Sequence, residues 1–171
     1  GKVNDIISVK RGTIPLKSVT TSFMADPKTG YVRLDRFSQD SDKELAKAIR
    51  SLKRQGAQNL IFDLRDNPGG LLSVARDVAD EFLGKDKLIV FTKDRKGEET
   101  TVYATSEGEF EKGKLVILIN EGSASASEIV AGAVQDNDRG WVIGRRSFGK
   151  GLVQEEMTLA DGSKIRLTTR R

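Results

Sequence analysis

The strongest constraint on the fold is an alternation of strand-like apolar runs with segments whose apolar residues recur at helical spacing. The strand-like runs cover residues 31–37, 59–64, 88–92, 100–104, 114–120 and 141–145. Helical spacing is found in residues 41–52, 71–83 and 127–135. This alternation predicts an α/β fold, in which right-handed βαβ crossovers join a mainly parallel sheet. Residues 152–159 and 164–169 flank Ala160-Asp161-Gly162 and predict a C-terminal hairpin.

The first predicted helix has recognisable signals at both ends. Ser41 and Glu44 form the pattern of a capping box, and Gly56 supplies a stop. Residues 1–20 are interpreted as an irregular lead-in, in which residues 6–10 resemble the remnant of a strand. The turn-forming residues 26–30 precede the first full strand that the sequence predicts.

The sequence contains no His and no Cys, which removes most of the common catalytic sites. Ser-His-Asp and Cys-His catalysis are impossible, and so are zinc sites built from thiolate or imidazole ligands. Only oxygen-ligand metals would remain, and we expect neither a metal nor another cofactor. If the chain is an enzyme, its general base must be Lys, Asp, Glu or Tyr. A chain of 171 residues fits one domain with a substantial core.

The net charge of +4 raises the question of a nucleic-acid partner. The basic residues are interleaved with Asp and Glu, as in residues 41–55 and 93–100, and only two Tyr and one Trp are available for base stacking. The charges are therefore interpreted as a solvated surface, and we expect no nucleic-acid binding.

Three turns rich in Gly or Ser are predicted to lie at one edge of the sheet, at residues 63–70, 121–128 and 147–151. In a parallel sheet every such turn emerges at the carboxyl edge, where α/β proteins usually place their sites. Neighbouring strands lie about 5 Å apart, so a βαβ unit can bring Ser125 and Lys150 into contact although 25 positions separate them.

Each of these two residues has an ordinary interpretation and a chemical one. Ser125 and Glu128 match a capping box, yet a serine at a helix amino terminus also lies beside free N–H groups that can stabilise an oxyanion. Lys150 can be a cation in a flexible turn or a general base. Catalysis requires a neutral amine, and close packing allowed by Gly149 and Gly151 would desolvate it. The Gly-Lys-Gly sequence lacks the spacing of a phosphate-binding loop.

Three sequence blocks, DLRDNPGG at 63–70, NEGSASASEI at 120–129 and GRRSFGKGLVQ at 144–154, closely resemble the carboxyl-terminal processing peptidases, also called tail-specific proteases. The resemblance implies a core of the crotonase and Clp-protease type. It also implies a serine endopeptidase that cleaves proteins or peptides near an apolar C-terminus, usually outside the cytoplasm.

The resemblance implies a role for five residues. Ser125 matches the nucleophile, Lys150 the general base and Gln154 the residue that orients the lysine. The backbone N–H groups of Gly70 and Ala126 match the oxyanion donors. A spacing of four along a strand would keep Lys150 and Gln154 on one face. Without the resemblance, Gln154 would be an exposed glutamine and Gly70 a turn glycine. The run at residues 65–67 is expected to shape its turn.

Members of this family usually carry a PDZ domain ahead of the core, and residues 1–12 look at most like its last strand. Residues 13–171 are expected to form the peptidase core, which in the family normally continues further. Two alternatives to an active peptidase stay open. One is a module that binds peptides or apolar ligands without cleaving them, and the other is a core that is inactive without its PDZ domain.

Overall fold

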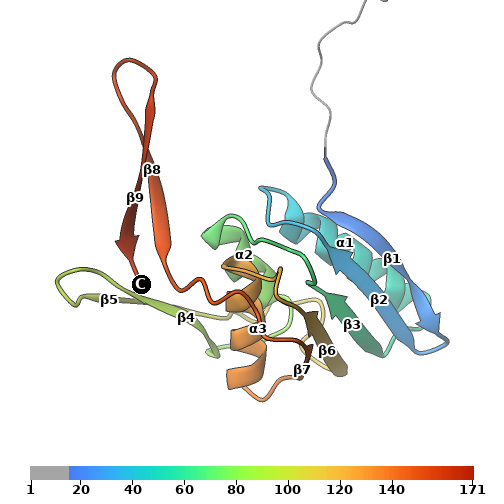
Figure 1. Ribbon diagram of the computed structural model, residues 1–171. Helices are drawn as coiled ribbons and strands as arrows, with labels where there is room; N and C mark the ends of the chain where they lie inside the picture. The colour runs from blue at the N-terminus through green and yellow to red at the C-terminus, as the bar shows by residue number, and fades with distance from the viewer. Residues whose placement is uncertain (1–15) are drawn as a thin grey trace, which may run out of the picture.

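A computed structural model describes residues 16–171 and shows a five-stranded sheet, three helices and two hairpins (Figure 1). The sheet has the order β1-β2-β3-β6-β7 and comprises β1 (Val19–Asp26), β2 (Thr29–Leu34), β3 (Asn59–Asp63), β6 (Lys114–Ile119) and β7 (Trp141–Gly144). The helices are α1 (Ser41–Arg54), α2 (Leu72–Asp80) and α3 (Ala126–Asp136). The hairpins are β4 (Leu88–Lys93) with β5 (Glu99–Tyr103), and β8 (Val153–Thr158) with β9 (Lys164–Arg170). The predicted α/β class, mainly parallel sheet and C-terminal hairpin are confirmed.

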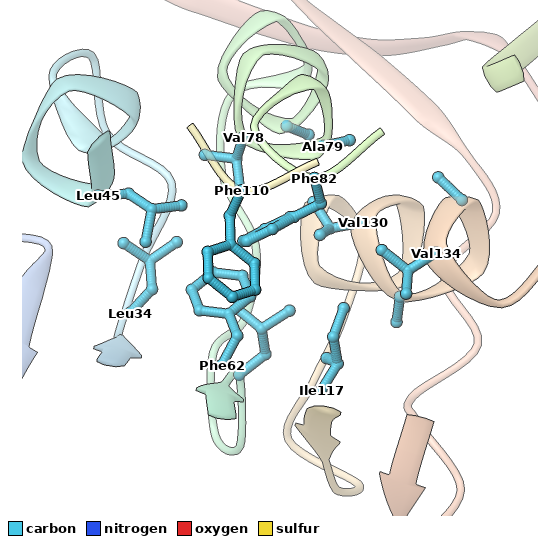
Figure 2. Packing of buried hydrophobic residues seen from close by; sticks show 14 of the residues in the cluster. Leu34, Leu45, Phe62, Val78, Ala79, Phe82, Phe110, Ile117, Val130 and Val134 are labelled. Carbon is cyan, nitrogen blue, oxygen red and sulfur yellow. The ribbon is translucent and has the colours of Figure 1, made fainter. Parts of the chain in front are cut away.

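The core lies between one face of the sheet and the helices. Buried residues alternate along the strands, as in β2 and β3, because successive side chains of a strand point to opposite faces. Figure 2 shows Phe62 from β3 pointing toward Phe82, which follows α2, and the two ring centroids are 5.2 Å apart. Both rings are fully buried, and removing each from water stabilises the fold by about 1.5–3 kcal/mol.

Strand β1 was not predicted from the sequence. Its residues, VTTSFMAD, are mostly exposed, so it shows neither a continuous apolar run nor a regular alternation. It pairs antiparallel with β2 across a tight turn and forms one edge of the sheet. The expected irregular lead-in is therefore wrong for residues 19 and 20. The strand remnant expected at residues 6–10, and the PDZ remnant expected at 1–12, lie outside the described residues.

The capping box predicted for α1 is also wrong. The N-cap residue is Asp40, and no side-chain hydrogen bond caps the helix. The Glu44 carboxylate instead accepts hydrogen bonds from the backbone N–H groups of Ser18 and Val19, at 2.8 and 2.9 Å. The Ser41 hydroxyl donates to the Ser18 hydroxyl and accepts from the Ser38 N–H, each at 2.7 Å. The two polar side chains thus attach the start of β1 to α1 instead of closing the helix end.

The order of the parallel strands positions the functional region. Strands β3, β6 and β7 are parallel neighbours, so their carboxyl ends reach the same edge of the sheet. The segments that follow these three ends are the three turns singled out in the sequence. Of the helices between residues 16 and 171, none combines the length and the apolar character needed to cross a membrane.

The C-terminal hairpin projects away from the sheet, beside the β4–β5 hairpin (Figure 1). The end of β9 is attached to the end of β4, since Lys93 and Arg171 exchange two backbone hydrogen bonds at 2.8 and 3.1 Å. The two hairpins therefore form one continuous structure beside α2 and α3, and β8 extends from the turn that carries Lys150.

Candidate active site

Ser125, Lys150 and Gln154 line one cleft of about 500 Å³ between the sheet edge and the two hairpins. Much of the remaining lining is apolar and consists of Leu71, Leu72, Val90, Phe91, Ile129 and Leu152. The parallel topology predicted that Ser125 and Lys150 would meet at this edge, whereas the contribution of Val90 and Phe91 from β4 was not predicted. The cleft combines a hydroxyl, an amine and an amide with apolar walls, which is the usual composition of a site for a specific organic ligand.

Ser125 has an unusual backbone conformation, with φ 56° and ψ −110°. A serine rarely adopts positive φ, and such residues cost about 1–3 kcal/mol and cluster at functional sites. It is the N-cap residue of α3 and has the arrangement of a capping box with Glu128, in which the Glu128 carboxylate accepts from the Ser125 N–H at 2.8 Å but no side-chain hydrogen bond from Ser125 caps the helix. Ser125 thus lines the cleft from a strained turn between a strand and a helix, as a nucleophilic serine often does.

The glycine turn packs directly against this serine. A Cβ atom on Gly69 would lie 2.6 Å from the Ala124 carbonyl oxygen and 2.9 Å from Ser125 Cβ. The adjacent Gly70 forms an isolated parallel bridge with Phe37, and a Cβ atom there would lie 2.1 Å from the Phe37 carbonyl oxygen. Both positions need glycine because another backbone approaches too closely for any side chain.

Two backbone N–H groups next to Ser125 have no hydrogen-bond acceptor in the described part of the chain. One belongs to Gly70, whose bridge to Phe37 uses the Gly69 carbonyl and the Leu71 N–H instead. The other belongs to Ala126, the first residue of α3, whose N–H has no partner within the helix. These are the two donors predicted from the sequence, and free N–H groups of this kind can stabilise a developing oxyanion.

Asn67 holds the glycine turn and the serine turn together. Its buried side chain donates to the Leu34 carbonyl at 2.8 Å and accepts from the Gly69 N–H at 2.9 Å. Its carbonyl oxygen accepts from the Ala124 N–H and from the Ser127 hydroxyl, each at 3.0 Å. This agrees with the expectation that residues 65–67 shape the turn, but the links to Ala124 and Ser127 could not be inferred from the sequence.

A second link between these turns lies in the charged cluster at the end of β3. Asp66 and Asn120 exchange two hydrogen bonds at 2.8 Å, through the Asp66 N–H and the Asn120 amide. Beside them, Arg65 and Tyr31 donate to the fully buried Asp63 carboxylate. Burial raises the pKa of Asp63, but the hydrogen bonds from Arg65 and Tyr31 outweigh it, so the pKa lies below its usual value. The Asp63 carboxylate at the end of β3 is therefore ionised and paired with Arg65.

Lys150 is exposed, and its amine donates to the Gln154 side-chain oxygen at 3.3 Å. In this conformation no hydrogen bond joins Lys150 Nζ and Ser125 Oγ. The expected close packing around the lysine is wrong, because positions for Cβ atoms on Gly149 and Gly151 have no neighbouring atom within 4 Å. Lys150 also precedes β8, so its contact with Gln154 joins a turn to a strand and does not follow from a shared strand face.

The carboxylate of Glu128 connects the serine turn to the lysine turn. It accepts hydrogen bonds from the backbone N–H groups of Ser125, Gly149 and Lys150 and from the Ser147 hydroxyl, at distances of 2.6–2.9 Å. Burial raises the pKa of Glu128, but these hydrogen bonds outweigh it and lower the pKa below its usual value. In the sequence Glu128 is recognisable only as part of a helix cap, and no sequence pattern distinguishes that role from the link between the two turns.

Comparison with known proteins assigns this arrangement to a family. The sequence profile of Peptidase family S41 matches residues 28–171, which include all strands of the sheet except β1, the residues that line the cleft and both hairpins. The chain belongs to peptidase family S41. The predicted relationship to carboxyl-terminal processing peptidases is thereby confirmed, as relatives at 46% and 44% identity carry that name.

Two relatives and one solved structure illustrate the match. The carboxyl-terminal-processing protease of Synechocystis sp. is 46% identical over 139 residues, which cover 81% of this chain and 32% of that protein. The chloroplastic carboxyl-terminal-processing peptidase 3 of Arabidopsis thaliana is 44% identical over 141 residues, which cover 82% of this chain and 27% of that protein. The photosystem II D1 C-terminal processing protease superimposes with a TM-score of 0.81 at 34% identity, over 94% of this chain and 45% of that one. The chain thus spans less than half the length of each.

Proposed function

We propose that this S41 chain is the catalytic core of a serine endopeptidase, in which Ser125 is the nucleophile and Lys150 the general base. The observation that carries the proposal is the shared cleft, in which Ser125 lies on a strained turn opposite Lys150 and Gln154. The free N–H groups of Gly70 and Ala126 support it, since an acyl-transfer site needs donors beside its nucleophile. The sequence contains no His and no Cys, so the base must be of another type, and Lys150 is the lysine that lines the cleft together with Ser125.

The reaction proceeds in two stages. The neutral Lys150 amine takes the proton of the Ser125 hydroxyl, and the hydroxyl oxygen attacks the substrate carbonyl carbon. The N–H groups of Gly70 and Ala126 hold the resulting oxyanion, and the Lys150 ammonium returns the proton to the leaving amine as the peptide bond breaks. A water molecule, deprotonated by Lys150, then attacks the ester and releases Ser125. For the first step Lys150 Nζ must come within about 3.2 Å of Ser125 Oγ.

Gln154 is proposed to orient the lysine, because its side-chain oxygen already accepts a hydrogen bond from Nζ. A rotation about the side-chain bonds of Lys150 can redirect the amine toward Ser125. The open surroundings of Gly149 and Gly151 leave room for this rotation. A bound substrate would cover the exposed amine and remove water from it, which favours its neutral form.

The substrate is proposed to be a protein or peptide cleaved near an apolar C-terminus. Apolar side chains such as Leu71, Phe91 and Ile129 line the cleft together with Ser125 and suit apolar substrate residues. The main chain of an extended substrate can pair with a strand beside the cleft. By analogy with relatives that process carboxyl termini, we further propose that the complete protein works outside the cytoplasm and uses a PDZ domain to capture the tail.

The test is cleavage of a quenched fluorescent peptide with an apolar C-terminus by the wild-type chain, Ser125→Ala and Lys150→Ala. Lys164→Ala removes another exposed lysine, one that lies in the C-terminal hairpin and outside the cleft lining, and serves as the control. Both active-site variants should lose turnover by roughly a thousandfold or more, as dyad partners act as a unit, and Lys164→Ala should not. Undiminished turnover by Ser125→Ala would refute the dyad.

One observation favours a second candidate, a module that binds peptides without cleaving them. The Lys150 amine is paired with Gln154 and not with Ser125, as it would be in a cleft that only holds a ligand. Saturable, reversible binding of the apolar peptide, with no cleavage by the wild-type chain, would identify this module. Cleavage that appears only when a PDZ domain is present would instead identify a core that depends on its partner domain.

A further inference from the structure

We propose that Glu128 is a positioning residue that holds the turn carrying Lys150 against the turn carrying Ser125. The inference rests on the proposed function, because it assigns to Glu128 the alignment of the nucleophile with its base. Glu128 lies in the first turn of α3 and is half-buried beside the cleft. Its carboxylate contacts both turns at once.

The two carboxylate oxygens divide four donors between them. Oε1 accepts from the Ser147 hydroxyl at 2.7 Å and from the Gly149 N–H at 2.6 Å. Oε2 accepts from the Ser125 N–H at 2.8 Å and from the Lys150 N–H at 2.9 Å. A single oxygen atom therefore bridges the backbone nitrogens of the proposed nucleophile and the proposed base. This contact fixes the relative positions of the two residues more directly than any contact between their side chains.

Few other contacts hold the lysine turn in place. The Phe148 N–H donates to the Ser123 carbonyl at 3.0 Å, but the Phe148 side chain is 70% exposed. The start of the turn carries the exposed ion pair between Arg145 and Glu121, at 2.7 Å. Exposed pairs of this kind contribute little to stability. The backbone contacts at Gly149 and Lys150 are therefore those made by Glu128.

The chemistry of the site requires a carboxylate at this position. Three of the four partners are backbone N–H groups, which can only donate, and an ionised carboxylate only accepts. A glutamine has the same shape, but its NH₂ group would face at least one backbone N–H group in either orientation. Glu128→Gln therefore keeps the packing and removes the bridge, whereas an aspartate would be too short to reach both turns.

The experiment compares Glu128→Gln with Glu121→Gln in the full chain. Glu121→Gln is the matched control, because it also removes a carboxylate that joins the two turns, but an exposed one. Hydrogen exchange of residues 145–152 should accelerate roughly tenfold or more in Glu128→Gln, since hydrogen bonds to a charged acceptor are lost. Turnover should fall roughly a hundredfold through kcat, with KM nearly unchanged, because the base is displaced from the nucleophile. Glu121→Gln should change both quantities by less than about threefold.

Unchanged exchange in residues 145–152 of Glu128→Gln would overturn the inference, as would a rise in KM with kcat preserved. If Glu128→Gln fails to fold, the same measurements are made on Ser147→Ala, which removes one donor to Glu128 without altering α3. It should accelerate exchange and lower turnover in the same direction, but by less. The exchange measurement requires no catalysis. Failure of the peptidase proposal would appear as turnover that survives Ser125→Ala, whereas failure of the Glu128 proposal would appear as unaltered exchange.

Discussion

Gly69 offers the sharpest test of how the glycine turn supports the serine turn. Its φ of +94° is strained for any residue with a side chain, and an added Cβ atom would lie 2.6 Å from the Ala124 carbonyl oxygen. Gly97, in the turn between β4 and β5, has a similar φ of +89°, but the nearest atom would be 3.7 Å from its Cβ, at ordinary contact distance. The pair Gly69→Ala and Gly97→Ala thus separates the cost of the close approach from the cost of backbone conformation.

The expected loss of stability in each variant follows from these contacts. Both variants should lose about 1–2 kcal/mol of stability, because alanine is forced into positive φ. Ordinary contact begins at 3.4 Å, so in Gly69→Ala the Ala124 backbone must also move by roughly 1 Å. The total loss in Gly69→Ala should then reach about 3–4 kcal/mol, and turnover should fall roughly a hundredfold because Ser125 moves with the turn.

Urea unfolding measures the stability of both variants, and peptide cleavage measures their turnover. A match between Gly69→Ala and Gly97→Ala within about 0.5 kcal/mol, together with full turnover in both, would refute the argument. It would mean that the glycine turn and the serine turn adjust independently, and that the close approach at Gly69 does not position the nucleophile.

Three further predictions concern strain, packing and pH. Ser125→Gly should be about 1 kcal/mol more stable than Ser125→Ala in urea unfolding, because relief of the positive φ at residue 125 exceeds the entropic cost of glycine. Equal stability of the two variants would show that the backbone conformation at residue 125 is not strained. Phe62→Ala should cost about 3–5 kcal/mol, since it opens a cavity against Phe82, and a loss below about 1 kcal/mol would contradict the packing. Glu128 has a lowered pKa in the folded chain, so its contribution to stability is present above its usual value of 4.5 and is lost as the pH falls through the lowered pKa. Protection of residues 145–152 against hydrogen exchange, corrected for intrinsic rates, should therefore persist at pH 5; its loss there would contradict this.

The sequence predicts the parts of the fold that bury apolar surface in a regular pattern. Strand β3, for example, reads as a compact apolar run, and the structure places it at Asn59–Asp63, within one residue of the prediction. Strand β1 escaped prediction because it is an exposed edge strand, stabilised by pairing with β2 and not by burial. The capping box predicted at Ser41 does not form, because the backbone N–H groups of the distant residues Ser18 and Val19 donate to the Glu44 carboxylate.

The candidate site, like the fold, can be predicted from the sequence only in part. The gathering of Ser125, Lys150 and Gln154 in one cleft follows from the order of parallel strands, which the sequence pattern indicates. The contacts that hold the turns together do not follow from it, because Asn67 and Glu128 bind backbone groups far away in the sequence. A side chain that binds backbone atoms places no constraint on the residue type of its partner. No pattern in the sequence therefore reveals such a contact.

The most direct test of the central claim is covalent labelling by a serine-directed fluorophosphonate, followed by mass mapping of the modified residue. The wild-type chain should carry one adduct, on Ser125, and the rate of labelling should fall at least roughly a hundredfold in Lys150→Ala while Lys164→Ala labels normally. An adduct on another residue, or labelling of Ser125 at the same rate without Lys150, would contradict the assignment of Ser125 as a nucleophile activated by Lys150.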